Sequence, residues 1–201
     1  MNILFVCSGN TCRSPLAVAA WQAFAVPSLQ ASARTADAEV PQLPAISVSS
    51  AGLTAYDGAP ASHYTCAIAR DWGVDLSQHL SRRLTAEMVA EAQLVCTMTT
   101  DQAATVRLRF AVDPQDVLLL GDFAPETEDL LRRLTDSMEL APMDEATPDE
   151  ARREHHSILD PYGGSVEAYQ TCAAQIRAAV LGLVQSLCEG TIPNLKEDKG
   201  A

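Results

Sequence analysis

The sequence has little that would suit it to a membrane, to nucleic acid or to export. None of its apolar runs approaches the length of a membrane span, and its N-terminus lacks the basic flank of a signal peptide. Basic residues are scarce, because 14 Lys and Arg stand against 26 Asp and Glu, which gives a formal net charge of −12. This balance disfavours nucleic acid and acidic membranes as partners.

The six cysteines form no recognisable pattern either. Their spacing matches neither a metal site nor a disulfide framework. Without an export signal, we expect reduced thiols and a cytoplasmic location. No metal and no cofactor are predicted. The chain has 201 residues, of which 47% are hydrophobic, so it is long enough for one domain with a substantial core.

The most informative stretch lies at residues 3–15. Residues 3–6 are apolar, as in a short buried strand, and Pro15 suits the first turn of a helix. Between them, five residues separate Cys7 from Arg13. A loop of this length can curl around a tetrahedral oxyanion, with its backbone N–H groups pointing inward at the N-terminus of the following helix.

The residue types in this loop fit such a geometry. Gly9 and Asn10 tolerate the left-handed backbone that a tight curl requires. Arg13 can hold two phosphate oxygens with its planar guanidinium. Cys7 would lie at the bottom, where the positive field favours a nucleophilic thiolate, and Ser14 could hydrogen-bond to the sulfur. A purely structural cysteine is the weaker interpretation, because none of the other five cysteines has an arginine six positions on.

Residues 6–17, Val-Cys-Ser-Gly-Asn-Thr-Cys-Arg-Ser-Pro-Leu-Ala, resemble the phosphate-binding loop of the low-molecular-weight protein tyrosine phosphatase family. Residues 9–15 are most similar to its bacterial protein arginine phosphatase branch. The resemblance covers the chain to about residue 120 and again from 160 to 188. It implies a phosphatase that hydrolyses phosphotyrosine or phosphoarginine on a protein substrate through a cysteinyl-phosphate intermediate. The loop residues that would bind the substrate are Ser8, Gly9, Asn10, Thr11, Cys12 and Ser14.

Strands and helices are predicted to alternate along the chain. The apolar patterns predict strands at 3–6, 46–50, 94–98 and 117–120, and helices at 14–25, 60–72, 87–92, 101–110 and 165–188. This order indicates an α/β fold, with a four-stranded parallel sheet inside a three-layer α/β/α arrangement. The phosphate-binding loop would follow the first strand, at the carboxyl edge of the sheet.

Residues 1–188 are expected to form a single phosphatase domain. Two segments outside the resemblance, at about 27–44 and 122–156, are predicted to be insertions, and the second could hold an extra helix at 127–140. The charged segment 189–201 contains the only two lysines and is predicted to be a disordered tail.

The sequence Asp-Pro-Tyr-Gly-Gly-Ser at 160–165 supplies a second half for the site. Attack by Cys7 expels a leaving group that needs a proton, and hydrolysis of the phosphocysteine then needs a base, so one carboxyl can do both jobs. The same residues could be only a turn before a helix capped by Ser165. Beside a loop at Cys7, we interpret Asp160 as the acid and base, since Asp-Pro is the general-acid motif of the resembling family. Tyr162 before two glycines is similar to the arginine phosphatase branch and could form a pocket wall.

Two loop residues carry further hypotheses. Cys12 lies within loop reach of Cys7 and could act as a resolving thiol after oxidation, or simply fill the loop as a small residue. Tyrosine phosphatases of this family usually carry an aliphatic β-branched residue at the position of Thr11. Its hydroxyl could therefore meet the polar nitrogens of phosphoarginine, unless Thr11 is merely a well-fitting loop residue.

Two alternative functions share some of these features. A thiol-coupled arsenate reductase has the same fold and loop but requires further cysteines near the site, and Cys66 and Cys96 are isolated in the sequence. A non-catalytic phosphoresidue-binding module would be expected to lack Cys7, Arg13 or Asp160.

Overall fold

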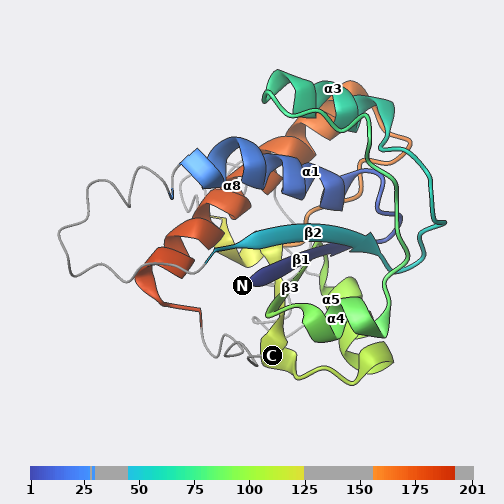
Figure 1. The fold of residues 1–201 in the computed structure, drawn as a ribbon. Helices are drawn as coiled ribbons and strands as arrows, with labels where there is room; N and C mark the ends of the chain where they lie inside the picture. The colour runs from blue at the N-terminus through green and yellow to red at the C-terminus, as the bar shows by residue number, and fades with distance from the viewer. Residues whose placement is uncertain (28, 30–44, 125–155, 193–201) are drawn as a thin grey trace, which may run out of the picture.

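A four-stranded parallel sheet in the order β2-β1-β3-β4 forms the centre of the computed structural model (Figure 1). The structure describes residues 1–27, 29, 45–124 and 156–192. The strands are β1 (Asn2–Cys7), β2 (Ser47–Gly52), β3 (Leu94–Thr97) and β4 (Val117–Leu119). Each predicted strand is present, with its ends within two residues of the predicted ones, and the predicted parallel sheet is confirmed.

Helices cover both faces of this sheet (Figure 1). One layer contains α1 (Arg13–Ala20), α3 (His63–Asp71) and α8 (Val166–Glu189), and the other contains α4 (Ala86–Glu91) and α5 (Thr100–Phe110). Helix α1 runs on into a π-helical turn, η1 (Trp21–Ala25), so together they match the single helix predicted at 14–25. Short 3-10 turns, η2 (Pro114–Asp116) and η3 (Leu120–Phe123), flank β4. The three-layer α/β/α prediction is therefore confirmed.

Strand β1 is buried on both faces, which explains its unbroken apolar run. Ile3, Phe5 and Cys7 pack into the core cluster that includes α1 and α8. Leu4 and Val6 pack into the opposite cluster, with residues of α4 and α5. Successive side chains of a strand point to opposite faces, so an apolar residue is needed at every position.

Helix α3 begins later than the predicted residue 60. Ser62 caps it and accepts a hydrogen bond from the backbone N–H of Thr65. Pro60 instead forms an isolated antiparallel bridge with Leu80, which lies in the connection before α4. The local sequence pattern had assigned Pro60 to the helix, but its pairing with Leu80 keeps it extended.

The sequence was expected to contain no segment long and apolar enough to span a membrane, and helix α8 is an exception to this expectation. Within the described part of the chain, it alone is long and apolar enough to cross a membrane by length and composition. A core helix passes the same test, and nine residues of α8 are buried, including Ile176, Val180 and Leu183. The apolar stripe of α8 accordingly packs against α1, α3, η1 and η3.

The predicted insertions at 27–44 and 122–156 lie mostly outside the described residues. The same holds for the helix predicted at 127–140 and for most of the tail predicted at 189–201, of which the structure describes only the first residues.

Candidate active site

The loop between β1 and α1 lies at the carboxyl edge of the sheet, where open α/β sheets bind ligands (Figure 1). Asn10 adopts the left-handed conformation expected for the curl, with φ +55°. Gly9, the other residue type in the loop that tolerates this conformation, does not use it, because Gly9 has no positive φ. A Cβ at Gly9 would meet only Thr11 Oγ1, at 3.6 Å. One left-handed residue is therefore enough to turn the chain.

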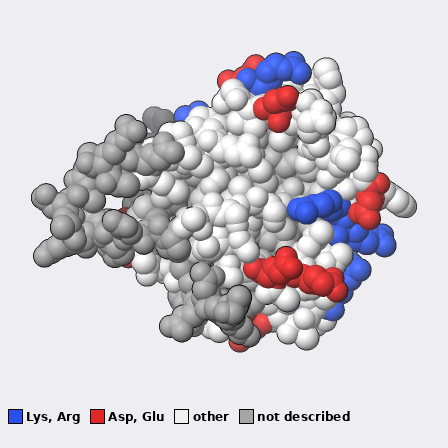
Figure 2. Space-filling model, in the orientation of Figure 1, with Lys and Arg blue, Asp and Glu red and all other residues white. Residues whose placement is uncertain are grey.

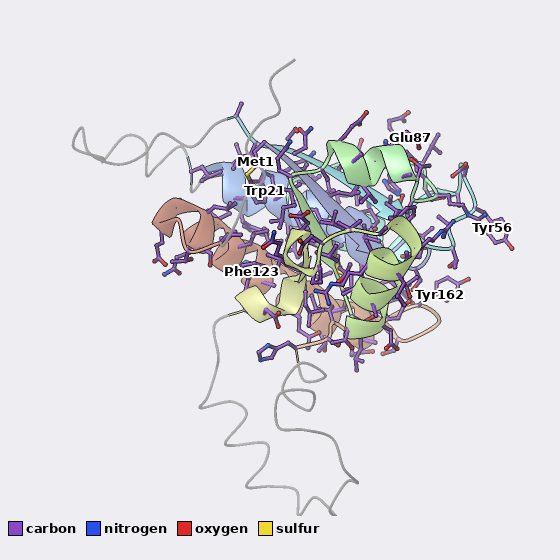
Figure 3. The ribbon with its side chains drawn as sticks, turned by 90° about the horizontal axis from the view of Figure 1, so that it is seen from below. Met1, Trp21, Tyr56, Glu87, Phe123 and Tyr162 are labelled. Carbon is purple, nitrogen blue, oxygen red and sulfur yellow. The ribbon has the colours of Figure 1, made fainter. Side chains whose placement is uncertain are left out.

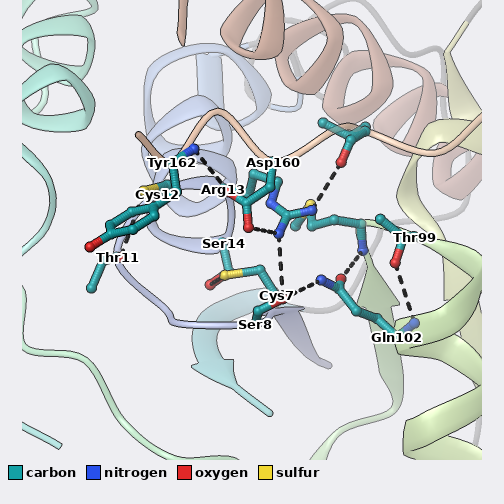
Figure 4. Close-up of polar contacts among 12 residues, drawn as sticks. Cys7, Ser8, Thr11, Cys12, Arg13, Ser14, Thr99, Gln102, Asp160 and Tyr162 are labelled. Atoms are coloured by element: carbon teal, nitrogen blue, oxygen red, sulfur yellow. Dashed lines mark hydrogen bonds and ion pairs between the residues drawn. The ribbon is translucent and has the colours of Figure 1, made fainter. Parts of the chain in front are cut away.

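Cys7 ends β1 with its sulfur at the bottom of the loop. The backbone N–H of Asn10 donates to Cys7 Sγ at 3.2 Å. Ser14 Oγ lies 3.1 Å from the same sulfur atom (Figure 4). Ser14 Oγ also lies 3.3 Å from the carbonyl oxygen of Ala51, to which it can donate. The Cys7 sulfur therefore faces an N–H donor and a hydroxyl at the N-terminal end of α1.

The side chain of Asn10 is fully buried and bonded to the protein on all sides. Its Nδ2 donates to Ser14 Oγ at 2.8 Å and to Ser50 Oγ, on β2, at 2.9 Å. Its Oδ1 accepts from the backbone N–H of Arg82 at 2.8 Å. His79 Nε2 lies 2.8 Å from the Asn10 carbonyl oxygen, so this nitrogen carries a proton and donates it. Asn10 thus ties the loop to β2 and to the segment before α4, and its backbone N–H faces the sulfur.

Gly52 lets β2 end directly under this loop. A Cβ at Gly52 would lie 2.7 Å from the carbonyl oxygen of Ser8 and 2.8 Å from the backbone nitrogen of Asn10. Both neighbours are backbone atoms that cannot move aside, because the backbone N–H groups of Leu53 and Thr54 bond to the carbonyls of Cys7 and Ser8. Only glycine fits at this position.

Arg13 is buried, and its guanidinium reaches the segment that precedes α8. Nη1 donates to the carbonyl oxygen of Ile158 at 3.1 Å, and Nη2 forms an ion pair with Asp160 Oδ2 (Figure 4). The Nε of Arg13 is also buried but has no hydrogen-bond partner among the described residues. A buried N–H without a partner costs free energy, and an oxyanion bound at the loop would supply the missing acceptor.

Asp160 lies in a turn that holds its carboxylate beside Arg13. Its Oδ1 accepts from the backbone N–H of Tyr162 at 3.2 Å, while Oδ2 faces the guanidinium. Gly163 has φ +76°, and Ser165 caps α8 by accepting from the N–H of Ala168. The turn-and-cap interpretation of this sequence is therefore confirmed, and the same turn also brings the carboxylate to the site. The Asp160 side chain is 43% exposed, so solvent reaches the outer side of the ion pair with Arg13.

The other predicted site residues differ in how closely they approach the loop. Thr11 is partly exposed, with Oγ1 3.6 Å from Cys12 Sγ. Cys12 is buried, and its sulfur lies 3.4 Å from Tyr169 Oη on α8. The side chain of Tyr162 is 76% exposed and projects at the same end of the molecule as Tyr56 (Figure 3). The expected pocket wall is therefore an exposed ring at the rim of the site.

Two residues near the site were missed from the sequence. Gln102 on α5 is buried, and its Nε2 donates to Ser8 Oγ at 3.0 Å (Figure 4). Cys172 on α8 lies near enough for the charges of Arg13, Asp160 and Cys7 to act on its thiol. Burial nevertheless raises the pKa of Cys172 to about 12, against the opposing effect of Arg13. Neither residue belongs to a local motif, so no sequence signal pointed to them.

Three basic side chains lie near this end of the sheet although the chain as a whole is acidic. Arg82, Arg83 and Arg109 are all exposed there. Arg82 Nη2 donates to the carbonyl of Ser50 at 3.1 Å, and Arg109 Nη1 donates to that of Leu53 at 3.1 Å. Figure 2 shows basic side chains gathered toward the edge where β2 ends, beside acidic ones. An anionic substrate would therefore meet positive charge close to the loop.

Comparison with known proteins agrees with this geometry. The family model for low molecular weight phosphotyrosine protein phosphatase matches residues 2–142. A protein-arginine-phosphatase from Geobacillus stearothermophilus is 26% identical, over 92% of this chain and 95% of its own. A probable low molecular weight protein-tyrosine-phosphatase, EpsP, from Ralstonia solanacearum is 34% identical, over 60% of this chain and 71% of its own.

The solved structures give the same result for the fold. The structure of the YwlE arginine phosphatase from Geobacillus stearothermophilus superposes with a TM-score of 0.64 at 26% identity, and the match covers 94% of each chain. Since the family model spans well over half of the sequence and the fold agrees, the chain belongs to the low molecular weight phosphotyrosine protein phosphatase family.

Proposed function

We propose that this protein removes phosphoryl groups from protein side chains, with Cys7 as nucleophile, Arg13 as the oxyanion clamp and Asp160 as general acid and base. The observation that carries this proposal is the surroundings of the Cys7 sulfur. The sulfur accepts from the N–H of Asn10 and contacts the Ser14 hydroxyl, and the buried guanidinium of Arg13 in the same loop has an N–H without a partner among the residues that the structure describes. These groups suit a thiolate and a phosphoryl dianion bound next to each other.

The reaction would proceed in two displacements at phosphorus. Cys7 Sγ forms a bond to phosphorus while the bond to the substrate's oxygen or nitrogen breaks, and Asp160 gives its proton to the leaving atom. Water then attacks the phosphocysteine, Asp160 takes a proton from that water, and Cys7 leaves as the thiolate. The backbone N–H groups and Arg13 hold the oxygens of phosphorus in both steps.

The Arg13–Asp160 ion pair gives this cycle a means of control. The guanidinium of Arg13 contacts the carboxylate of Asp160. A bound phosphoryl dianion would take over the guanidinium and place its own negative charge next to Asp160. Two neighbouring anions favour protonation of one of them, which is the form of Asp160 that the first step requires.

Phosphoarginine is the substrate that we favour over phosphotyrosine. The relative named as an arginine phosphatase aligns over nearly the whole of both chains, whereas the probable tyrosine phosphatase aligns over 60% of this one. Thr11 offers a hydroxyl to the guanidinium nitrogens, which would otherwise lie unpaired against a methyl group at a cost of about 1–3 kcal/mol. We further propose a single domain over residues 1–188, a cytoplasmic location and no cofactor.

The arsenate reductase alternative is disfavoured by the thiols around the site. Such a relay needs thiolates that attack disulfides. Burial raises the pKa of Cys172 to about 12 and also raises that of Cys96, so both would stay protonated near neutral pH.

Parallel turnover assays test both the activity and the preference. The wild-type protein should release phosphate faster from a phosphoarginine peptide than from a phosphotyrosine peptide, and Cys7→Ser should release none from either. Thr11→Ile should lower phosphoarginine turnover and spare phosphotyrosine turnover. If both activities of Thr11→Ile change by the same factor, Thr11 does not set specificity. Substantial turnover by Cys7→Ser would overturn the proposed mechanism.

A further inference from the structure

The side-chain amide of Gln102 has a defined orientation. Its Oε1 accepts a hydrogen bond from the backbone N–H of Met98 at 3.1 Å, and its Nε2 faces Ser8 Oγ at 3.0 Å (Figure 4). A backbone N–H can only donate, so the amide atom that faces Met98 must be the oxygen. Gln102 therefore presents an N–H to Ser8. Its side chain is only 6% exposed, so water does not readily replace this bond.

This contact constrains the proton of the Ser8 hydroxyl. Ser8 Oγ faces two donors, Gln102 Nε2 and, at the long distance of 3.5 Å, Arg13 Nη2. A hydroxyl has a single proton and two lone pairs, and a proton cannot point at an N–H group. In the described part of the chain no acceptor takes the Ser8 proton, and Ser8 is partly exposed beside Cys7. The proton is therefore directed away from Gln102 and Arg13, and is free to bind a ligand oxygen.

We propose that Gln102 is a positioning residue, which makes Ser8 a hydrogen-bond donor to an oxygen of the phosphoryl group. This proposal rests on the function proposed above, because it requires a phosphoryl group at the loop. Without Gln102, the Ser8 hydroxyl could turn its proton toward the space that the amide had filled. With Gln102, the donor is already oriented when the substrate arrives, so no reorientation is needed as charge develops.

A double-mutant cycle tests this inference. Ser8→Ala removes the donor, and Gln102→Met keeps the length of the side chain but loses its amide. Each change should lower kcat/KM on the phosphoarginine peptide and weaken inhibition by inorganic phosphate, each by about 10- to 100-fold, as for a hydrogen bond to a charged group. The double variant should fall no more than about threefold below Ser8→Ala, because both changes remove the same interaction.

Gln93→Met is the matched control, because Gln93, like Gln102, has a side-chain oxygen that accepts from a backbone N–H. Gln93 Oε1 accepts from the backbone N–H of Asn2 at the start of β1, whereas Cys7 lies at the other end of the same strand. This variant should keep wild-type kinetics. Gln102→Glu is the second probe, since one carboxylate oxygen can still accept from Met98 while the other would accept the Ser8 proton. It should lose as much activity as Ser8→Ala, and most of that loss should vanish in the Ser8→Ala background.

The inference is overturned if Ser8→Ala keeps wild-type kinetics. It is also overturned if a change at Gln102 lowers kcat/KM by the same factor with Ser8 and with Ala at position 8, because Gln102 would then act through the β3–α5 connection. Failure of the proposed function looks different. The wild type would then show no turnover, or Cys7→Ser would keep it.

Discussion

Asp160→Asn separates the charge of this side chain from its shape. The amide keeps an oxygen for the backbone N–H of Tyr162, so the turn before α8 should persist. It loses the negative charge that contacts Arg13 and the proton that the leaving group needs. The substitution should therefore have opposite effects on phosphate binding and on catalysis.

The effect on binding follows from the exposure of the ion pair. The carboxylate of Asp160 and a phosphoryl dianion would compete for the same guanidinium. The Asp160 side chain is 43% exposed, and ion pairs that solvent can reach contribute about 0.2–1 kcal/mol. Removal of this competitor should tighten binding of inorganic phosphate or vanadate by up to about fivefold.

The effect on turnover should depend on the leaving group. General acid catalysis contributes about 10²–10⁴-fold when the departing atom is basic. Phosphoarginine turnover by Asp160→Asn should fall by a factor in that range, whereas an activated aryl phosphate should lose much less. Competitive inhibition constants for phosphate and kcat on both substrates, measured at the same pH, decide the matter. Equal losses on the two substrates, or weaker binding of phosphate, would refute this reasoning.

Three further predictions concern stability and oxidation. Asn10→Ala loses three side-chain hydrogen bonds and puts alanine at φ +55°, so the free energy of unfolding measured in urea should fall by about 2–5 kcal/mol. A fall of less than about 1 kcal/mol would contradict the role of Asn10 in holding the loop. Peroxide should inactivate the enzyme reversibly through a Cys7–Cys12 disulfide, which mass spectrometry of the oxidised protein must find. Burial raises the pKa of Cys172 and Tyr169 to about 12, from 9.0 and 10.0 respectively, so the folded state binds more protons than the unfolded state in alkali. The stability that these two groups contribute is present below pH 9 and is lost as the pH rises toward 12. The urea concentration at the unfolding midpoint should therefore be lower at pH 10.5 than at pH 8. An equal midpoint at the two pH values would contradict this prediction.

Local spacing was sufficient to predict the loop and the sheet. The five residues between Cys7 and Arg13 lie between an apolar strand and a helix, and over so short a distance the backbone has few ways to connect the two. The alternation of apolar runs predicted all four strands, since a parallel sheet covered on both faces requires apolar residues at nearly every position. Both inferences depend only on residues close together in the sequence.

Local pattern was less reliable wherever a distant partner decided the conformation. The predicted start of α3 was wrong because Pro60 pairs with Leu80. Gly9 and Asn10 both tolerate a left-handed backbone, but only Asn10 adopts it in this loop. In each case the residue type allowed more than one backbone conformation, and contacts from elsewhere in the chain selected one.

The tertiary structure alone decided how the side chains of the site are oriented and which distant residues hold them. Arg13 and Asp160 are 147 residues apart in the sequence and form an ion pair. The amide of Asn10 finds its partners on β2 and before α4, and Gln102 reaches Ser8 from α5. A sequence motif can specify the atoms that bind a phosphoryl group. Their orientation depends on hydrogen bonds whose partners meet only when the crossover connections bring the ends of β1, β2 and β3 to one edge of the sheet.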